Sequence, residues 1–296
     1  MSFSTFSEYI FKCDRLDKRI SNEDDQKRYY DAWMKKYQEV FADITTEKAI
    51  EWDLRCAKSM REIFTSAEFL VEAKKCLETR CYSSYYFCLY YSLFHAIYAC
   101  EFMDVDARID TLDSITHSKL IKIFESAYCN GRNGIFSKDI ISFFLELRYR
   151  REYYSYVTPF NNIFDFNDDI IKLEDHDKDC YQVACFHSLL VHRSYFRRGG
   201  KFEKIVNPQQ YRYMEDLFER FFAKKSNEGK MMLDPAAENI RSEAIRDGFA
   251  PWYICLELDH QYDELHTYDG FYNMEYHGIE PLNAADSYSV VYSAML

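Results

Sequence analysis

The sequence CYSSYYFCLYYSLFHAIYACEFM spans Cys81 to Met103 and decides the fold. From Cys81 through Cys100 it contains no Asp, Glu, Lys or Arg, and large residues occupy positions all round a helix. Such a segment must be surrounded by lipid or by other helices. Its length would just span a bilayer, but six tyrosines, three serines and a histidine are spread along it, where a spanning helix keeps Tyr at the interfaces. The stretch therefore favours the buried helix of a water-soluble bundle, in which the phenol groups find partners.

Composition predicts long helices and a protein of the cytoplasm. The 296 residues include only 8 Gly and 5 Pro, against 26 Tyr and 24 Phe, and this length can bury one large core or two. The first residues, MSFSTFSEYIFKCDRL, lack a basic start followed by an apolar run, so we expect no secretory signal. The 10 cysteines are dispersed without a CxxC pair, which is typical of buried thiols in a reducing compartment. A net charge of -12 means that any nucleic-acid surface must be local.

The predicted fold class is mainly α, and the chain divides into three parts. Residues 1–45 form an N-terminal helical extension, 46–200 an antiparallel helical bundle, and 201–296 an acidic C-terminal subdomain that is α or α+β. Thr46 is expected to cap a long helix that runs to Thr79, and a single break near Ser66 stays open. Ser137 is expected to cap a helix that Pro159 ends. Further helices are expected at 116–129, 175–198, 208–225 and 235–247, with short strands or an irregular fold in 251–296.

The central segments resemble the HEPN family, the higher eukaryotes and prokaryotes nucleotide-binding domains. Tyr90–Ala96, YYSLFHA, is similar to the YYAxFHA signature of the family's second helix. The helix before it has an A-x-x-x-L-like face over Ala67–Leu77, and Thr116–His117 resembles the family's H-x-x-(V/L) element. Leu147–Tyr153 is similar to the R-x-x-A-D-Y element. The resemblance covers residues 50–198, about half of the chain.

The resemblance implies a bundle of four to five helices that often forms a homodimer. Many members are ribonucleases that use neither a metal nor a cofactor, and their R-x4-6-H motif supplies an Arg for phosphate charge and a His for the ribose proton. This chain departs from the motif, because none of its 8 histidines has an arginine five to seven positions earlier. Tyr153 and Tyr154 stand where the base would follow Arg148, and a phenol with a pKa of about 10 is a poor base at neutral pH.

Candidate catalytic residues follow from this comparison. Arg148 would bind phosphate, and His117, at the start of a different helix, or one of Tyr153 and Tyr154 would assist proton transfer. The alternative for His117 is a helix-start histidine bonded to neighbouring backbone. For His95, within the aromatic segment, a satisfied core histidine is the favoured interpretation.

Two basic stretches are candidate RNA-binding sites. Arg150 and Arg151 follow Arg148 within about one helical turn and could bind phosphate beside the tyrosines, or form a solvated face paired with Glu146 and Glu152. The second stretch comprises Arg193, Arg197, Arg198 and Lys201, followed by Lys204. It would meet either an anionic ligand or, as we favour, the acidic segment 251–296, which would then compete with RNA.

The functional hypothesis is a HEPN-type RNA-directed effector, an endoribonuclease toxin of a bacterial antiviral defence or toxin–antitoxin system. Its partners would be RNA or a nucleotide and an antitoxin or another subunit of a defence complex, without a membrane. The alternative is a catalytically inactive HEPN-like subunit that binds a nucleotide, RNA or a protein. Asp259, Asp263 and His266 share a helical face, but they fit an ordinary acidic surface better than a metal site, so no metal is expected.

Overall fold

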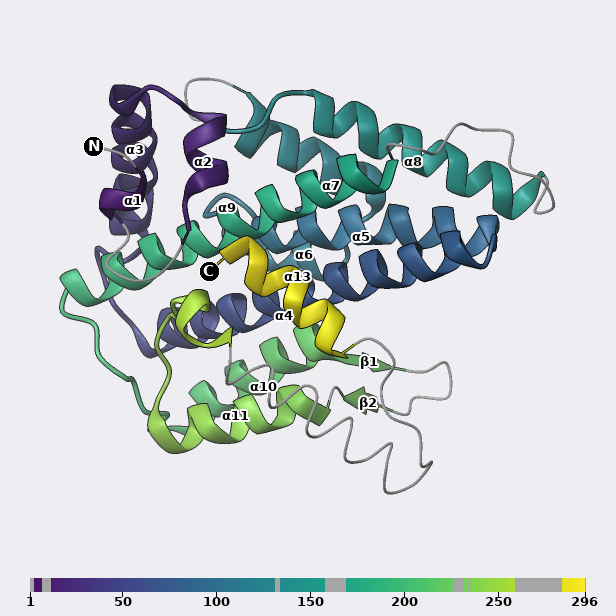
Figure 1. Cartoon of the computed structure of the whole chain (residues 1–296). Helices are drawn as coiled ribbons and strands as arrows, with labels where there is room; N and C mark the ends of the chain where they lie inside the picture. The colour runs from purple at the N-terminus through teal and green to yellow at the C-terminus, as the bar shows by residue number, and fades with distance from the viewer. Residues whose placement is uncertain are drawn as a thin grey trace.

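The computed structural model of the chain is a mainly helical bundle (Figure 1), described for residues 3–6, 12–130, 134–157, 169–225, 231–233, 235–258 and 284–295. This confirms the predicted mainly α class. The elements are α1 (Phe3–Phe6), α2 (Asp14–Arg19), α3 (Glu23–Val40), α4 (Thr46–Glu78), α5 (Tyr82–Phe102), α6 (Ile109–Asp113), α7 (His117–Phe124), the π-helix η1 (Glu125–Cys129), α8 (Asp139–Tyr156), α9 (Asp169–Arg197), α10 (Pro208–Phe222), β1 (Ala223–Lys225), β2 (Met231–Leu233), α11 (Pro235–Asp247), the 3-10 helix η3 (Ile254–Leu256) and α13 (Ala284–Met295).

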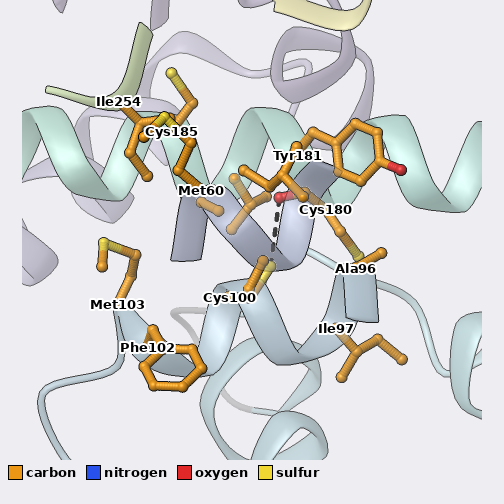
Figure 2. Packing of buried hydrophobic residues seen from close by; sticks show 14 of the residues in the cluster. Met60, Ala96, Ile97, Cys100, Phe102, Met103, Cys180, Tyr181, Cys185 and Ile254 are labelled. Carbon is orange, nitrogen blue, oxygen red and sulfur yellow. Dashed lines mark hydrogen bonds between the residues drawn. The ribbon is translucent and has the colours of Figure 1, made fainter. Parts of the chain in front are cut away.

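The aromatic stretch forms α5, which lies at the centre of the bundle. It packs against α4, α9, α8 and α7, so its apolar faces are covered by protein, as expected. Figure 2 shows Cys100 pointing toward α9, where its thiol is 3.4 Å from the backbone oxygen of Cys180, with Met60 of α4 nearby. None of the described helices combines the length and hydropathy that a bilayer span requires.

The long helix α4 forms without interruption. Thr45, not Thr46, caps it, because the Thr45 hydroxyl accepts a hydrogen bond from the Lys48 backbone N–H at 3.2 Å. The helix continues through Ser66 without the break that the sequence allowed there. The Ser66 hydroxyl accepts a hydrogen bond from the Tyr181 phenol at 2.7 Å, so this side chain joins α4 to α9 rather than competing with the helix backbone.

A single residue in the left-handed region ends α4. Arg80 has a φ of 59°. The N–H of Cys81 donates to the oxygen of Cys76 at 2.8 Å, and the N–H of Arg80 donates to the oxygen of Leu77 at 3.1 Å. These two bonds form a Schellman motif, which satisfies carbonyls that the helix end leaves open. The connection between the two helices is therefore tight and directs α5 back along α4.

The bounds of α8 and α9 differ from the prediction. Lys138 occupies the cap position of α8, while the Ser137 hydroxyl bonds the Asp139 carboxylate at 3.1 Å instead of capping the backbone. The helix ends at Tyr156, and Pro159 lies outside the described residues. Helix α9 begins at Asp169 rather than residue 175, and its added turn contributes to the core, because Leu173 is fully buried and Ile170 packs against the core.

The C-terminal third contains both expected and unexpected elements. Helix α11 has the predicted bounds, but α10 ends at Phe222 rather than residue 225 because residues 223–225 pair with 231–233 as an antiparallel ladder. In 251–296 the described residues form η3 and the helix α13, which was not predicted. Residues 259–283, and residues 131–133 of the turn sequence CNGRNG at 129–134, lie outside the described residues.

One hydrophobic cluster joins the described parts. Its buried members range from Phe3 to Met295 and come from the elements before, within and after the predicted bundle. Helix α13 packs across α4 and α9 (Figure 1). The backbone oxygen of Met295 accepts a hydrogen bond from the N–H of Lys12 at 2.8 Å. The 10 cysteines are free thiols, most of them buried. The boundaries after residues 45 and 200 stay predictions.

Candidate functional site

His117 lies at the first position of α7, against the aromatic face of α5. The Thr116 hydroxyl caps α7 by accepting a hydrogen bond from the Lys119 N–H at 3.3 Å. The imidazole ring lies parallel to the Tyr90 ring, with 5.4 Å between centroids, and its Nδ1 is hydrogen-bonded to the Tyr90 hydroxyl. The Phe94 ring is 4.8 Å away. His117 is thus half-buried and held in orientation by side chains, not by backbone.

The surroundings of His117 favour the neutral imidazole. Burial lowers its pKa, and the positive charges of Arg151 and Arg148 lower it further, against the opposing effect of Glu152. Nε2 has no hydrogen-bond partner within the described part of the chain. If Nδ1 carries the proton and donates it to the Tyr90 oxygen, Nε2 presents a lone pair. The reverse tautomer would present Nε2–H as a donor.

Arg148 of α8 reaches the start of α7. Its Nη1 donates to the hydroxyl of Ser118, the residue after His117, at 3.2 Å, and its Nε donates to Glu152 at 2.9 Å. The side chain keeps 37% of its surface exposed. Two residues from different helices that the sequence singled out, Arg148 and His117, are therefore brought together.

Arg151 joins the same cluster from three positions further along α8. Its guanidinium lies over the rings of Tyr90 and Tyr91, 5.0 and 6.0 Å from their centroids. Its Nη2 is 3.6 Å from the carboxylate of Glu152, and its Nε is buried without a partner among the described residues. Glu152 is thus shared by two arginines, which lower its pKa. The cluster carries more positive than negative charge in a chain of net charge -12.

The other predicted residues of α8 point elsewhere. Arg150 is mostly buried and pairs with Glu146 at 2.8 Å and with Asp169 of α9. Tyr154 is fully buried and stacks on Tyr86, with 4.8 Å between ring centroids. Tyr153 is partly buried against the core. The expected pairs of Arg150 with Glu146 and of Arg148 with Glu152 are both present.

The second basic stretch lies at the far end of α9. Asp169, the partner of Arg150, begins this 29-residue helix, so the exposed Arg197 and Arg198 are about 40 Å away along it. Arg193 is half-buried and Lys201 exposed. Most of the acidic segment predicted to cover them, including Asp259, Asp263 and His266, lies outside the described residues. Among the residues that the structure describes, no three His, Cys, Asp or Glu side chains lie close enough together to hold a metal ion.

Comparisons with known proteins give no further guide. No family model, curated protein or solved structure matches the chain. What the site can do must follow from its own residues.

An aromatic surface adjoins the Arg148–His117 cluster and was missed in the sequence. Phe87 is 42% exposed and packs on Tyr91, with 4.5 Å between ring centroids, and Tyr91 lies under Arg151. One helical turn on, His95 pairs with Glu62 of α4 at 2.5 Å, so it is a satisfied histidine at the edge of the core. The i, i+4 spacing of Phe87, Tyr91 and His95 was the available signal, but it does not distinguish an exposed stripe from a buried one.

Together these groups suit a phosphodiester better than a neutral ligand. Two guanidinium groups can bind phosphate oxygens, and exposed rings can stack on bases. A neutral imidazole beside them can accept a proton near pH 7.

Proposed function

We propose that the chain is a HEPN-like, RNA-directed effector that cleaves RNA without a metal, as an endoribonuclease toxin of a bacterial defence or toxin–antitoxin system. The observation that carries this proposal is the contact of Arg148 with Ser118, which sets a guanidinium beside a neutral His117. The helical bundle and the ordered motifs along the chain agree with it. Arg148 and His117 would take the roles that one R-x4-6-H motif fills in the family.

The proposed chemistry is an attack of a ribose 2′-oxygen on the adjacent phosphorus. Nε2 of His117 accepts the 2′-hydroxyl proton as the new O–P bond forms, and the P–O5′ bond breaks. The leaving O5′ takes up a proton from solvent water, which leaves a 2′,3′-cyclic phosphate and a 5′-hydroxyl. Arg148 and Arg151 bind the phosphoryl oxygens, where negative charge develops.

A homodimer would enlarge this open half-site. The proposed partners are a second copy of the chain, single-stranded RNA and an antitoxin or another subunit of a defence complex. The rings of Phe87 and Tyr91 would stack on bases, because unpaired bases bind proteins largely by stacking.

The second candidate is a catalytically inactive binding subunit. The ion pairs of Glu152 favour it, since this carboxylate holds Arg148 at 2.9 Å and lies 3.6 Å from Arg151 without any ligand. A site whose charges are already paired can bind a partner by exchange without performing chemistry. The absence of an R-x4-6-H motif points the same way.

An RNA cleavage assay separates the two candidates. Purified protein is incubated with tRNA and mRNA in EDTA, alongside Arg148→Ala and His117→Ala. We expect cleavage by the wild type and a loss of about 100-fold or more in both variants, the scale of losing one stabilising donor. Arg28→Ala is the matched control, because Arg28 is an exposed arginine of α3 paired only locally, with Asp25.

Two results would decide against the enzyme. Binding of RNA without cleavage, weakened by Arg148→Ala, would leave the binding subunit, especially if overexpression did not slow bacterial growth. Neither binding nor cleavage of RNA would reject both forms of the proposal.

A further inference from the structure

A cavity of about 250 Å³ lies between α4, α9, α11 and the segment that follows α11. It belongs to a different part of the molecule from the Arg148–His117 cluster, with which it shares no residue. Its lining includes Asp53, His192, Phe202, Trp252, Tyr253 and Glu257.

Asp53 brings to this cavity a buried carboxyl group, one oxygen of which has no hydrogen-bond partner among the described residues. The residue is 1% exposed. Its Oδ2 accepts hydrogen bonds from Trp252 Nε1 at 2.8 Å and from the Ala250 N–H at 3.2 Å. Its Oδ1 is also buried but has no partner in the described part of the chain. A buried carboxylate oxygen without a donor is costly, so this oxygen calls for a hydrogen-bond donor from outside the chain.

The charge around Asp53 specifies what kind of donor would fit. Glu257 lies near enough to act on the ionisation of Asp53, and Glu243 and Asp247 line the cavity as well. Among the described lining residues none is a lysine or an arginine. Arg246, outside the lining, pairs with Asp247 at 2.7 Å and with Glu243 at 3.7 Å. That arginine offsets the two α11 carboxylates, while Asp53 and Glu257 keep acidic side chains at the cavity.

The aromatic part of the lining also suits a cation. Trp252, Tyr253 and Phe202 present aromatic rings, which attract ammonium groups electrostatically. His192 Nδ1 donates a hydrogen bond to the carbonyl oxygen of Pro251 at 2.9 Å, so this nitrogen is already bound to the backbone. The volume falls below the roughly 300–1,000 Å³ of sites for drug-sized molecules, which limits the ligand to a short chain.

We propose that this cavity binds a small aliphatic primary ammonium ion. Its N–H group donates to Asp53 Oδ1, and its carbon chain packs against the aromatic rings. This proposal does not depend on the proposed RNA chemistry, and the two can be tested separately.

The affinity should depend on pH in a defined direction. Burial, with a contribution from Glu257, raises the pKa of Asp53 to about 8. At pH 7 about one carboxyl in ten is ionised, and at pH 9 about nine in ten, while an alkylammonium, like Lys, stays charged. The ammonium needs the ionised carboxylate, so binding should be about tenfold tighter at pH 9 than at pH 7. The titratable or charged groups around Asp53 are Cys56, His192, Tyr195, Glu243, Arg246, Asp247, Tyr253 and Glu257.

Calorimetric titration of the full chain with n-butylammonium chloride tests the proposal. We expect binding at pH 9, about tenfold weaker binding at pH 7, and no binding of n-butanol, a neutral molecule of similar size. Asp53→Asn keeps the shape of the side chain but removes its charge, and should weaken binding at least tenfold. Asp31→Asn is the control, because it removes one negative charge at an exposed position of α3.

A second variant protects the test against a folding defect. Ala244→Leu adds bulk to the cavity wall and leaves Asp53 in place, and it should also abolish binding. Circular dichroism confirms that both variants are folded. Equal binding of n-butanol, unchanged binding by folded Asp53→Asn, or no binding of n-butylammonium to the wild type between pH 6 and 9 would each overturn the proposal.

Discussion

Two acidic residues of α4 show how a few neighbours decide the ionisation of a buried carboxyl. Glu62 is 4% exposed and Asp53 1%. Glu62 nevertheless has its pKa lowered to about 2, because the attraction of Lys58 at 2.6 Å and His95 at 2.5 Å outweighs burial. Asp53 has only the neutral donors Trp252 and Ala250, so burial prevails and its pKa rises. Burial alone therefore does not predict the charge of a residue in this bundle.

The pKa of Glu62 makes a prediction about acid stability. The folded-state pKa of about 2 lies below the ordinary value of 4.5, so the ionised group stabilises the fold above pH 4.5, and this contribution is lost as the pH falls toward 2. Glu62→Gln should lower the free energy of unfolding at pH 7 by about 3 kcal/mol and flatten its fall below pH 4.5. Urea denaturation between pH 2 and 7 measures both effects.

The control for this prediction is Glu39→Gln. Glu39 is exposed and only 3.9 Å from Lys35, so its loss should change the unfolding free energy by no more than about 0.5 kcal/mol. An equal effect of the two substitutions would contradict the role assigned to the pair of Glu62 with Lys58 and His95.

The sequence allowed part of the candidate site to be predicted. Arg148 and His117 could be named as candidates because the segments that contain them resemble HEPN motifs. The bond of His117 to Tyr90 could not, since 27 positions separate the two residues and only the fold sets their distance. The burial of Tyr154 was also beyond prediction, because the aromatic residues of α8 point in several directions.

At the scale of elements, the connection between α4 and α5 contains a correctable strain. Arg80 has a positive φ at the position where Schellman motifs usually have glycine, since a Cβ is disfavoured there by roughly 1–2 kcal/mol. Arg80→Gly should raise the free energy of unfolding by about 0.5–1 kcal/mol, after the larger entropy of glycine in the unfolded chain is allowed for. Chemical denaturation measures the difference.

Arg80→Ala provides the matched comparison. Alanine keeps the Cβ and so the strain, while it removes the same exposed side chain. The stability of this variant should stay within about 0.5 kcal/mol of the wild type. A gain as large as that of Arg80→Gly would mean that the side chain, and not the backbone conformation, is the cause.

Helices with strong local signals were the ones that the sequence predicted well. The continuous aromatic pattern marked α5, and Pro235, at the first position of the helix, marked α11. The start of α9 was set too late, although Asn167 and Asp168, residue types that are favoured at helix N-caps, precede Asp169 in the sequence. Helix α13 was missed because its sequence, AADSYSVVYSAM, is helical mainly through its burial against α4 and α9.

At the scale of the molecule, the shared core predicts cooperative unfolding. The elements outside 46–200 cover it from several sides, with α3 on α9, α10 on α4, and α13 on both. A fragment of residues 46–200 would expose those faces to water. We expect it to unfold at a lower urea concentration than the full chain, or to aggregate, while the full chain unfolds in a single transition.

Circular dichroism and fluorescence during urea denaturation provide the measurement. Coincident transitions of the full chain are the expected result. A fragment 46–200 with the same midpoint as the full chain, or two separate transitions, would show that the predicted boundaries divide independent domains.

The position of α13 also determines when the protein can finish folding during its synthesis. The helix covers α4 and α9, yet the ribosome adds it more than 85 residues after Arg197, the last residue of α9. Until α13 is synthesised, the apolar faces of α4 and α9 that it will bury stay exposed. Partly folded chains that expose apolar surface are prone to aggregate and are bound by chaperones. Synthesis speed through residues 198–295 should therefore influence how much of the protein reaches its native state.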